Sequence, residues 1–133
     1  MTLASWNDNM RIKILKSKVH RATVTDTNVD YTGSMGMDED LMDAAGLVPY
    51  EHILVADVDN GTRHETYVVP TPRGQGDICV MGAAAHLVNL GDKVIVMAFA
   101  DLHPDEVANH KPKVVVVDEE NKPLAKQPAM VTE

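Results

Sequence analysis

Aromatic residues are scarce in this chain of 133 residues, which has one Trp, one Phe and three Tyr. So few rings exclude the stacking platforms that bind single-stranded nucleic acid. Aliphatic residues, valine above all, must fill the core instead, and β-branched side chains suit pleated sheets. A tightly curved barrel also leaves little interior room for rings. The length and the scarcity of rings together predict one small, mainly β domain.

Basic residues are outnumbered, with 12 Lys and Arg against 20 Asp and Glu and a net charge of −8. This balance disfavours binding to DNA phosphates, which needs a basic face, and to anionic membranes. The longest apolar runs, residues 94–100 and 114–117, are far shorter than the ~20 residues that span a bilayer. We therefore expect neither a nucleic acid nor a membrane as a partner.

A single cysteine, Cys79, allows no internal disulfide, and we expect it to be a buried structural thiol. Residues 1–10 are polar and lack the apolar stretch of a signal peptide. These two features predict a cytoplasmic protein. Because the regular pattern begins at Met10, we divide the chain into an N-terminal extension (residues 1–9), one domain (10–122) and a flexible C-terminal tail (123–133).

Six short β-rich runs predict the strands of this domain: residues 11–24, 52–58, 62–69, 78–81, 94–99 and 114–117. Asn60-Gly61 lies between two of them and predicts a hairpin with a tight turn, because both residues tolerate positive φ. The Gly and Ser content of residues 31–37 indicates a break. A short helix is expected to follow it, capped by Asp38 and ended by Gly46. Further helical turns are predicted within residues 82–87 and 104–110.

The Gly33-Ser34 dipeptide within this break is the first candidate for chemistry. Glycine can hold a strained backbone. The serine hydroxyl beside it can attack the preceding carbonyl, which moves the acyl group from nitrogen to oxygen. Elimination of the resulting ester would leave a new N-terminal keto-acyl group. A plain surface turn is the alternative, since Gly-Ser is common in loops.

Two groups of polar residues on predicted strands could bind an acidic substrate. The cluster Lys18-Val-His20-Arg21 offers ligands for a carboxylate, or forms a solvated basic strand. On the second arm of the hairpin, Arg63 and Tyr67 share one strand face and Thr66 takes the other. A tyrosine hydroxyl can deliver a proton to an anionic intermediate, although an ordinary exposed strand has the same pattern.

Small residues and histidines supply two weaker candidates. The Gly-Ala-Ala-Ala run at residues 82–85 would let a ligand approach the backbone at the start of a helix, or reflects close packing. His103, Asp105, Glu106 and His110 superficially offer metal ligands, but the HExxH spacing is absent. We therefore expect no metal there.

In combination and in order, these motifs resemble the pyruvoyl-dependent aspartate 1-decarboxylase family. The resemblance runs from about Met10 to Lys122 and rests on Lys18-Val-His20-Arg21, Tyr31-Thr-Gly33-Ser34, Asp43-Ala-Ala-Gly46, Asn60-Gly61-Thr-Arg63, Thr66-Tyr67 and Gly82-Ala-Ala-Ala-His86. It implies a six-stranded double-psi β-barrel with short helices. It also implies a homotetramer with active sites between subunits.

The resemblance further implies a proenzyme that cleaves itself between Gly33 and Ser34, assisted by Thr66. A β chain (residues 1–33) would end at Gly33, and an α chain (34–133) would begin with a pyruvoyl group made from Ser34. This covalent cofactor would form a Schiff base with the amino-acid substrate and accept electrons as CO2 leaves. The implied product of L-aspartate is β-alanine, a pantothenate precursor. Whether a maturation factor takes part stays open.

The matching motifs also assign site residues. The resemblance gives the substrate pocket Lys18, His20, Arg63, Thr66, Gly82, Ala83 and Ala84. Lys18 and Arg63 would bind substrate carboxylate, with His20 nearby. Tyr67 would protonate the decarboxylated carbon.

Two positions depart from the family pattern. Met81 stands where the family usually has Asn beside the reacting group, and Gly36 stands where Thr or Ala is more frequent. We expect Gly36 to loosen the backbone next to the cleavage site. Met81 leaves open the same chemistry on another acidic amino acid such as glutamate. An uncleaved barrel acting as a binding or regulatory module is the alternative from another class of protein, although the net charge argues against DNA.

Overall fold

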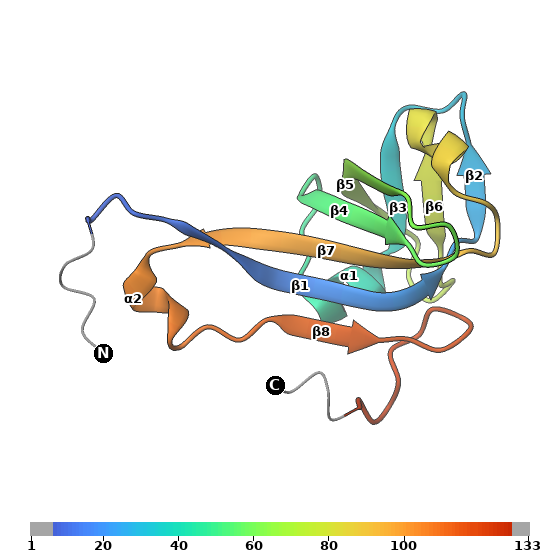
Figure 1. Cartoon of the computed structure of the whole chain (residues 1–133). Helices are drawn as coiled ribbons and strands as arrows, with labels where there is room; N and C mark the ends of the chain where they lie inside the picture. Colours follow the sequence, from blue (N-terminus) through green and yellow to red (C-terminus); the bar gives the residue numbers. More distant parts are fainter. Residues whose placement is uncertain (1–6, 129–133) are drawn as a thin grey trace.

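Residues 7–128 are described by the computed structural model of the chain, in which eight strands form one mixed sheet (Figure 1). The elements are β1 (Ile12–Thr23), β2 (Asp26–Asn28), β3 (Ser34–Asp38), α1 (Glu39–Ala45), β4 (His52–Asp57), β5 (Arg63–Thr71), β6 (Ile78–Met81), the 3-10 helix η1 (Gly82–Leu87), β7 (Lys93–Leu102), α2 (Pro104–Val107) and β8 (Lys113–Val116). The strand order is β2-β6-β3-β5-β4-β7-β1-β8. The predicted mainly β fold with short helices is confirmed. Within residues 7–128 the end strands β2 and β8 are not paired with each other, so the closed six-stranded double-psi barrel stays a prediction.

β1 and β7 form a long twisted antiparallel pair that extends away from the other strands toward α2 (Figure 1). Two bulges interrupt the pairing, one after Leu15 and one between Val19 and Ala22. Arg21 lies in the second bulge and has a φ of 63°, a left-handed conformation that is uncommon for residues other than glycine. Because a bulge re-aims side chains, the basic cluster of β1 lies at an irregular bend of the strand.

The core is built from valine, methionine and other aliphatic side chains. Val19, Val55 and Val94 are fully buried, as are Met35 and Met37. Among residues 7–128 no aromatic side chain belongs to the buried set. The aliphatic core predicted from the scarcity of rings is therefore present in the described part of the chain.

Helix α1 begins and ends where the sequence predicts. The Asp38 carboxylate accepts a hydrogen bond from the backbone N–H of Asp40, and Gly46 ends the helix in the left-handed conformation with φ of 72°. Leu41 and Met42 point into the core. Close packing of this short helix fixes Asp38, the last residue of β3, at the boundary between the two elements.

The break predicted at residues 31–37 is wrong in its second half, because Ser34–Asp38 forms strand β3. β3 lies between β5 on one side and β6 on the other, and Met35, Gly36 and Met37 are all buried. A central strand buried on both faces does not show the alternation of polar and apolar residues that marks a strand in sequence. The short edge strand β2 was also not predicted.

The hairpin of β4 and β5 is confirmed, but its turn is longer than the predicted two residues. The backbone N–H of Asp57 donates to the carbonyl of Thr62, and that of Gly61 donates to the carbonyl of Asp57. Gly61 has a φ of 77°, whereas Asn60 is not in the left-handed region. The turn therefore needs positive φ at one residue only.

The chain after β8 folds back on that strand. The N–H of Leu124 donates to the carbonyl of Val116, and the side chain of Gln127 donates to the same carbonyl. Asn121 is buried and its side-chain amide donates to the carbonyls of Thr23 and Gly76. The first residues of the segment predicted as a tail are thus hydrogen-bonded to the sheet. Residues 1–6 of the predicted extension and 129–133 of the predicted tail lie outside the described residues.

In the described part of the chain, no helix has the length and apolar character needed to cross a membrane.

Candidate active site

The Gly33-Ser34 peptide bond lies where the loop after β2 enters β3. Ser34 is half-buried and is the antiparallel partner of Met81, the last residue of β6. Gly33 is exposed. The bond therefore joins an accessible residue to one that is held in the sheet.

Gly82, at the start of η1, packs against Gly33, the residue that precedes this bond. A Cβ atom at position 82 would lie 2.6 Å from Cα and 2.9 Å from the backbone nitrogen of Gly33. Gly82 also has a φ of 81°. Both the contact and the conformation require glycine at this position. The small residues after it continue this surface, with Ala83 exposed and Ala84 half-buried.

Tyr67 and Thr66 lie in the middle of β5, beside the start of β3 where Ser34 lies. β3 and β5 are parallel, with Met35 beside Val68, so Ser34 and Tyr67 are the residues just before this pair. Alternation along both strands directs the side chains of Ser34 and Tyr67 to the same face. The ring of Tyr67 also lies 6.1 Å from that of Tyr50, a neighbour that the sequence did not indicate.

Lys18 lies on the solvent-facing side of the sheet. A row of directly opposed residues crosses the sheet from Lys18 to Glu65. It runs from Lys18 of β1 through Met97 of β7 and Leu54 of β4 to Glu65 of β5. Directly opposed residues share a face of a sheet. Lys18 therefore shares a face with Glu65, three strands away.

β5 shows the alternation that the sequence predicts. Arg63, Glu65 and Tyr67 are exposed, whereas Thr66 is half-buried on the other side. Through Glu65, Arg63 and Tyr67 share the solvent-facing side with Lys18. Three of the predicted site residues thus lie on one face of the sheet.

His20 completes the basic group on β1, two residues after Lys18. Its burial, together with the positive charges of Lys18 and Arg21, lowers the pKa of His20 below its ordinary value of 6.5. The imidazole is therefore neutral at pH 7. It offers a hydrogen bond, not a charge, to an acidic ligand.

Lys18 and Ser34 lie on strands that are four positions apart in the sheet. In the sheet β7, β4 and β5 lie between β1 and β3. With ~4.8 Å between neighbouring strands, the path along the sheet is roughly 19 Å, which exceeds the length of an amino acid such as aspartate. Within the sheet Lys18 is therefore remote from the predicted cleavage site, whereas Arg63 lies on β5, the strand that pairs with β3.

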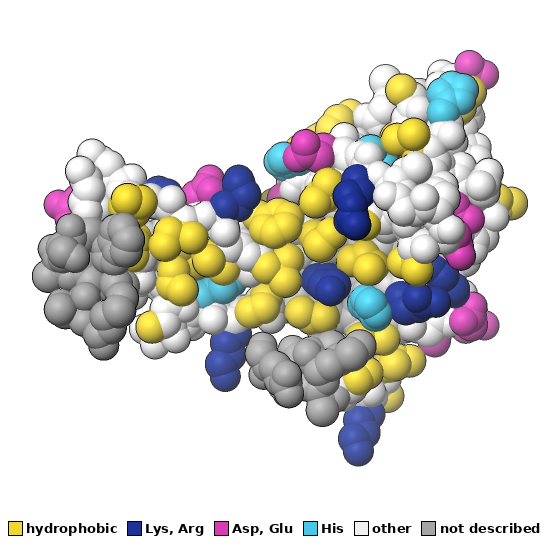
Figure 2. Space-filling model, viewed as in Figure 1, with side chains coloured by type: hydrophobic (Ala, Val, Ile, Leu, Met, Phe, Trp, Pro, Cys, Tyr) yellow, Lys and Arg dark blue, Asp and Glu magenta, His cyan; other side chains and the backbone are white. Residues whose placement is uncertain are grey.

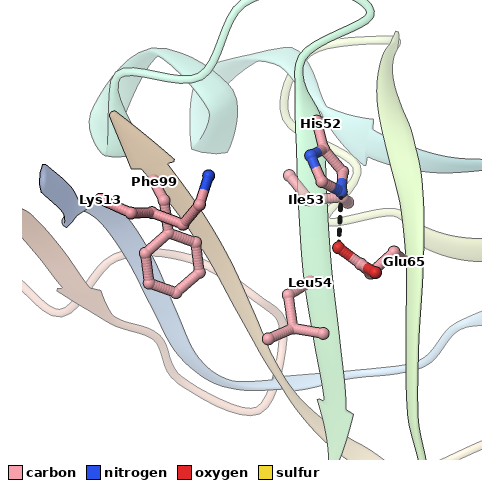
Figure 3. A pocket seen from close by; sticks show the side chains of 6 residues that line it. All are labelled: Lys13, His52, Ile53, Leu54, Glu65 and Phe99. Carbon is pink, nitrogen blue, oxygen red and sulfur yellow. Dashed lines mark hydrogen bonds and ion pairs between the residues drawn. The ribbon is translucent and has the colours of Figure 1, made fainter. Parts of the chain in front are cut away.

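A hollow of about 280 Å³ lies on the same face, lined by Lys13, His52, Ile53, Leu54, Glu65 and Phe99 (Figure 3). His52 and Glu65 point toward each other from neighbouring strands, with 2.8 Å between Nε2 and Oε1. None of the predicted site residues lines this hollow. No motif in the sequence singles out its lining, because the residues come from four different strands.

The two departures from the family pattern lie on neighbouring strands, Gly36 within β3 and Met81 at the end of β6. Met81 is half-buried and opposite Ser34. Gly36 is buried, and a Cβ atom there would lie 2.9 Å from Cγ2 of Thr71 and 3.3 Å from Cβ of Cys79. A side chain at position 36 would therefore require Thr71 or Cys79 to shift, and the loosened backbone expected of Gly36 stays a prediction.

The remaining candidates have local structural partners. Cys79 is buried, as predicted, and burial raises the pKa of its thiol. His103 caps α2 by accepting from the N–H of Asp105, and His110 contacts the carbonyl of Leu15 at 2.7 Å. These histidines fasten α2 to the β1 and β7 pair.

Comparison with known proteins matches the chain over almost its whole length. The sequence profile of the family described as aspartate decarboxylase matches residues 10–124. A protein named aspartate 1-decarboxylase from Caldicellulosiruptor bescii is 53% identical over 113 residues, covering 85% of this chain and 88% of the relative. Two relatives of the same name are each 50% identical. The one from Lactiplantibacillus plantarum covers 85% of this chain and 87% of its own length, and the one from Campylobacter jejuni covers 84% and 88%.

Proposed function

The chain belongs to the aspartate decarboxylase family, and from this premise we propose that it converts L-aspartate to β-alanine and CO2 for pantothenate biosynthesis. The observation that carries the proposal is the contact of Gly82 with Gly33 beside the Ser34 and Tyr67 pair. The proposal is supported by the hydroxyl groups of Ser34 and Tyr67 and by a closely packed glycine beside the Gly33-Ser34 peptide bond.

Self-processing would begin at Ser34. Its Oγ attacks the Gly33 carbonyl carbon, the C–N bond breaks, and the proton of the hydroxyl passes to the nitrogen, giving an ester. Elimination releases the Gly33 carboxylate, and hydrolysis of the remaining enamine consumes water and releases ammonia. Thr66 would assist the acyl shift. The α chain would then begin with a pyruvoyl group in place of Ser34.

The residues around the bond fit such a group. Gly33 is exposed, and glycine at position 82 lets the backbone at the start of η1 approach it closely. The pyruvoyl carbonyl supplies an electron sink for the bond between the α-carbon and the carboxylate. The backbone of Gly82, Ala83 and Ala84 would line the pocket, and the Tyr67 hydroxyl would donate a proton to the carbon that loses CO2.

The carboxylate-binding residues would come from a second subunit of a homotetramer. Lys18, His20 and Arg63 offer positive charge and hydrogen bonds to an acidic amino acid. Because roughly 19 Å of sheet separates Lys18 from Ser34, we expect a neighbouring chain to supply Lys18 and His20 to the site that contains Ser34.

Exposed apolar side chains support this assembly. Figure 2 shows them gathered on the face over β1, β7 and β4, with Lys, Arg and His among them. Ile12 and Phe99 are 36% and 39% exposed on the β1 and β7 pair. A self-associating surface covers such side chains, and the hollow beside Phe99 would receive side chains from the other subunit.

Intact mass spectrometry and an activity assay test the proposal together. The purified chain should yield two products divided after Gly33, the larger one lighter than a chain beginning with serine by the mass of one ammonia. Ser34→Ala should stay whole and release no CO2 from aspartate. A whole, inactive wild-type chain after prolonged warm incubation would instead favour an uncleaved binding module.

Glutamate is the second candidate substrate, because Met81 lies opposite Ser34 and offers no amide to a substrate there. Comparing turnover of aspartate and glutamate by the wild type and by Met81→Asn separates the two. Equal or faster turnover of glutamate by the wild type would overturn the assignment to aspartate. The cytoplasmic location stays a prediction from sequence, and whether a maturation factor takes part stays open.

A further inference from the structure

Asp57, the last residue of β4, is a buried carboxylate with one oxygen left over. It is 3% exposed. Its Oδ1 accepts hydrogen bonds from the N–H groups of Asp59, at 2.8 Å, and Asn60, at 3.1 Å. Its Oδ2 is buried and has no hydrogen-bond partner among residues 7–128. A buried carboxylate oxygen without a partner costs free energy, so this atom points to a missing ligand.

Two further carboxylates converge on Asp57. One oxygen from each of Asp57, Asp59 and Asp92 lies within 4.8 Å of one from each of the others. Asp92 precedes β7 and accepts the N–H of Asn89 at 2.9 Å, and Asp59 accepts the N–H of Lys93 at 2.8 Å. The backbone thus holds each carboxylate by one oxygen, and leaves the other oxygen of each unused among the described residues.

No side chain in the described part of the chain neutralises this group by an ion pair. Lys93 is next to Asp92 in sequence, but its ammonium contacts Thr23 at 2.6 Å and Glu119 at 2.8 Å. Burial and the facing carboxylate of Asp92 raise the pKa of Asp57, which reflects the repulsion between the two acids. A cation or a shared proton must relieve it.

We propose that Asp57, Asp59 and Asp92 bind a calcium ion. Carboxylate oxygens are the ligands that hard divalent cations prefer, and opposite ligands of Ca²⁺ lie about 4.6 to 5.2 Å apart. Oxygens within 4.8 Å of one another can therefore share one Ca²⁺, whose flexible coordination suits several carboxylates, whereas Mg²⁺ demands near-ideal octahedral geometry and keeps several of its waters. Water would complete the coordination on the exposed side, where Asp59 lies.

The ion would join two loops that the chain already holds together. Asn60 and Thr62, in the turn between β4 and β5, both donate to the carbonyl of Leu87 at the end of η1. Asp92 lies in the connection from η1 to β7. Calcium would tie the turn preceding Arg63 to the connection that follows residues 82–84. This inference does not depend on the decarboxylase activity.

Calorimetric titration of CaCl2 into the chelator-treated full-length protein tests the site. We expect one ion per chain, a higher melting temperature with calcium, and weaker binding of MgCl2. Asp59→Asn, a change at the surface, should weaken calcium binding about 10-fold or more. Asp57→Asn should abolish it while keeping the fold in chelator, because an amide can donate a hydrogen bond to Asp92.

Asp40→Asn is the matched control, because Asp40 lies in another acidic group, around Arg73. Calcium binding should be unchanged in this variant. Absence of calcium binding by the wild type would overturn the proposal. Binding that survives both Asp57→Asn and Asp59→Asn would overturn the site, and tighter binding of Mg²⁺ would overturn the choice of ion.

Discussion

Gly82 lies directly against Gly33, close enough that a Cβ atom at position 82 would be 2.6 Å from Cα of Gly33. Real Cβ atoms do not approach a backbone atom so closely, so any side chain at position 82 must displace one of the two segments. We expect Gly82→Ala to slow cleavage after Gly33 by about 10-fold or more, because the attack by Ser34 depends on its geometry with that carbonyl. A time course of intact masses measures the rate.

The control for this variant is Gly74→Ala. Gly74 has a φ of 85°, similar to that of Gly82, but nothing lies within 4 Å of a Cβ atom placed there. Both variants should lose about 1 kcal/mol of stability from the left-handed conformation. Only Gly82→Ala should also impair cleavage. Equal cleavage rates in the two variants would show that the contact with Gly33 plays no part.

Gly36 lets β3 approach Thr71 and Cys79. We therefore expect Ala or Thr, the residues more frequent at this position in the family, to lower the stability of the fold here. Gly36→Ala should lower the free energy of unfolding by about 1 to 3 kcal/mol, because its Cβ would lie 2.9 Å from Cγ2 of Thr71. Adding Thr71→Ser removes that methyl group and should restore part of the loss. Denaturant unfolding of the two single variants and the double variant gives the coupling energy. Additive effects would contradict the proposed steric contact.

Asp38 ties the end of β3 to the loop before β6, and it should make stability depend on acid pH. Burial disfavours its charged form, but hydrogen bonds from the N–H groups of Gly76, Asp40 and Gly74, together with Lys122, lower the pKa of Asp38 below 3.8. The folded state thus binds this proton less readily than the unfolded state. The stabilisation is complete above the ordinary pKa and is lost as the pH falls through the lowered one.

Asp38→Asn should therefore cost about 1.5 to 3 kcal/mol at neutral pH, and the difference in stability from the wild type should narrow as the pH falls below about 4. Thermal unfolding across this range measures it. The control is Asp43→Asn, which removes an exposed contact with Arg73 and should have a small effect at every pH. A constant difference between Asp38→Asn and the wild type would show that the charge of Asp38 is not what stabilises the fold.

Local signals were sufficient to predict several elements. Asp38 and Gly46 mark the ends of α1 because capping depends on a few adjacent residues. Asn60-Gly61 indicated the hairpin for the same reason. β3 was missed because its burial on both faces comes from β5 and β6, whose register with it is set by contacts distant in sequence.

The candidate site was predictable as a set of residues but not as an arrangement. The spacing of the motifs singled out Ser34, Tyr67 and Lys18, yet nothing local shows that Lys18 is four strands away from Ser34. The contact between Gly33 and Gly82 likewise joins residues far apart in the chain. The Asp57 group escaped notice because Asp92 reaches it from another loop and acidic residues are common on surfaces.

The separation of Lys18 from Ser34 predicts that two inactive variants can restore each other. Lys18→Ala should cleave itself but bind substrate poorly, and Ser34→Ala should stay whole and lack the cofactor. If one chain supplies Lys18 and its neighbour supplies Ser34, subunits mixed by co-expression contain sites with both residues intact. With random pairing of equal amounts, about one quarter of all sites should be active.

Decarboxylation of aspartate by the co-expressed mixture, set against each variant alone, measures this complementation. The control mixture combines Ser34→Ala with Tyr67→Phe, two changes at the same end of the β3 and β5 pair in one chain. That mixture should stay inactive, since every site would lack one of the two residues. Activity in the control mixture, or none in the first, would mean that Lys18 and Ser34 do not act together across a subunit boundary.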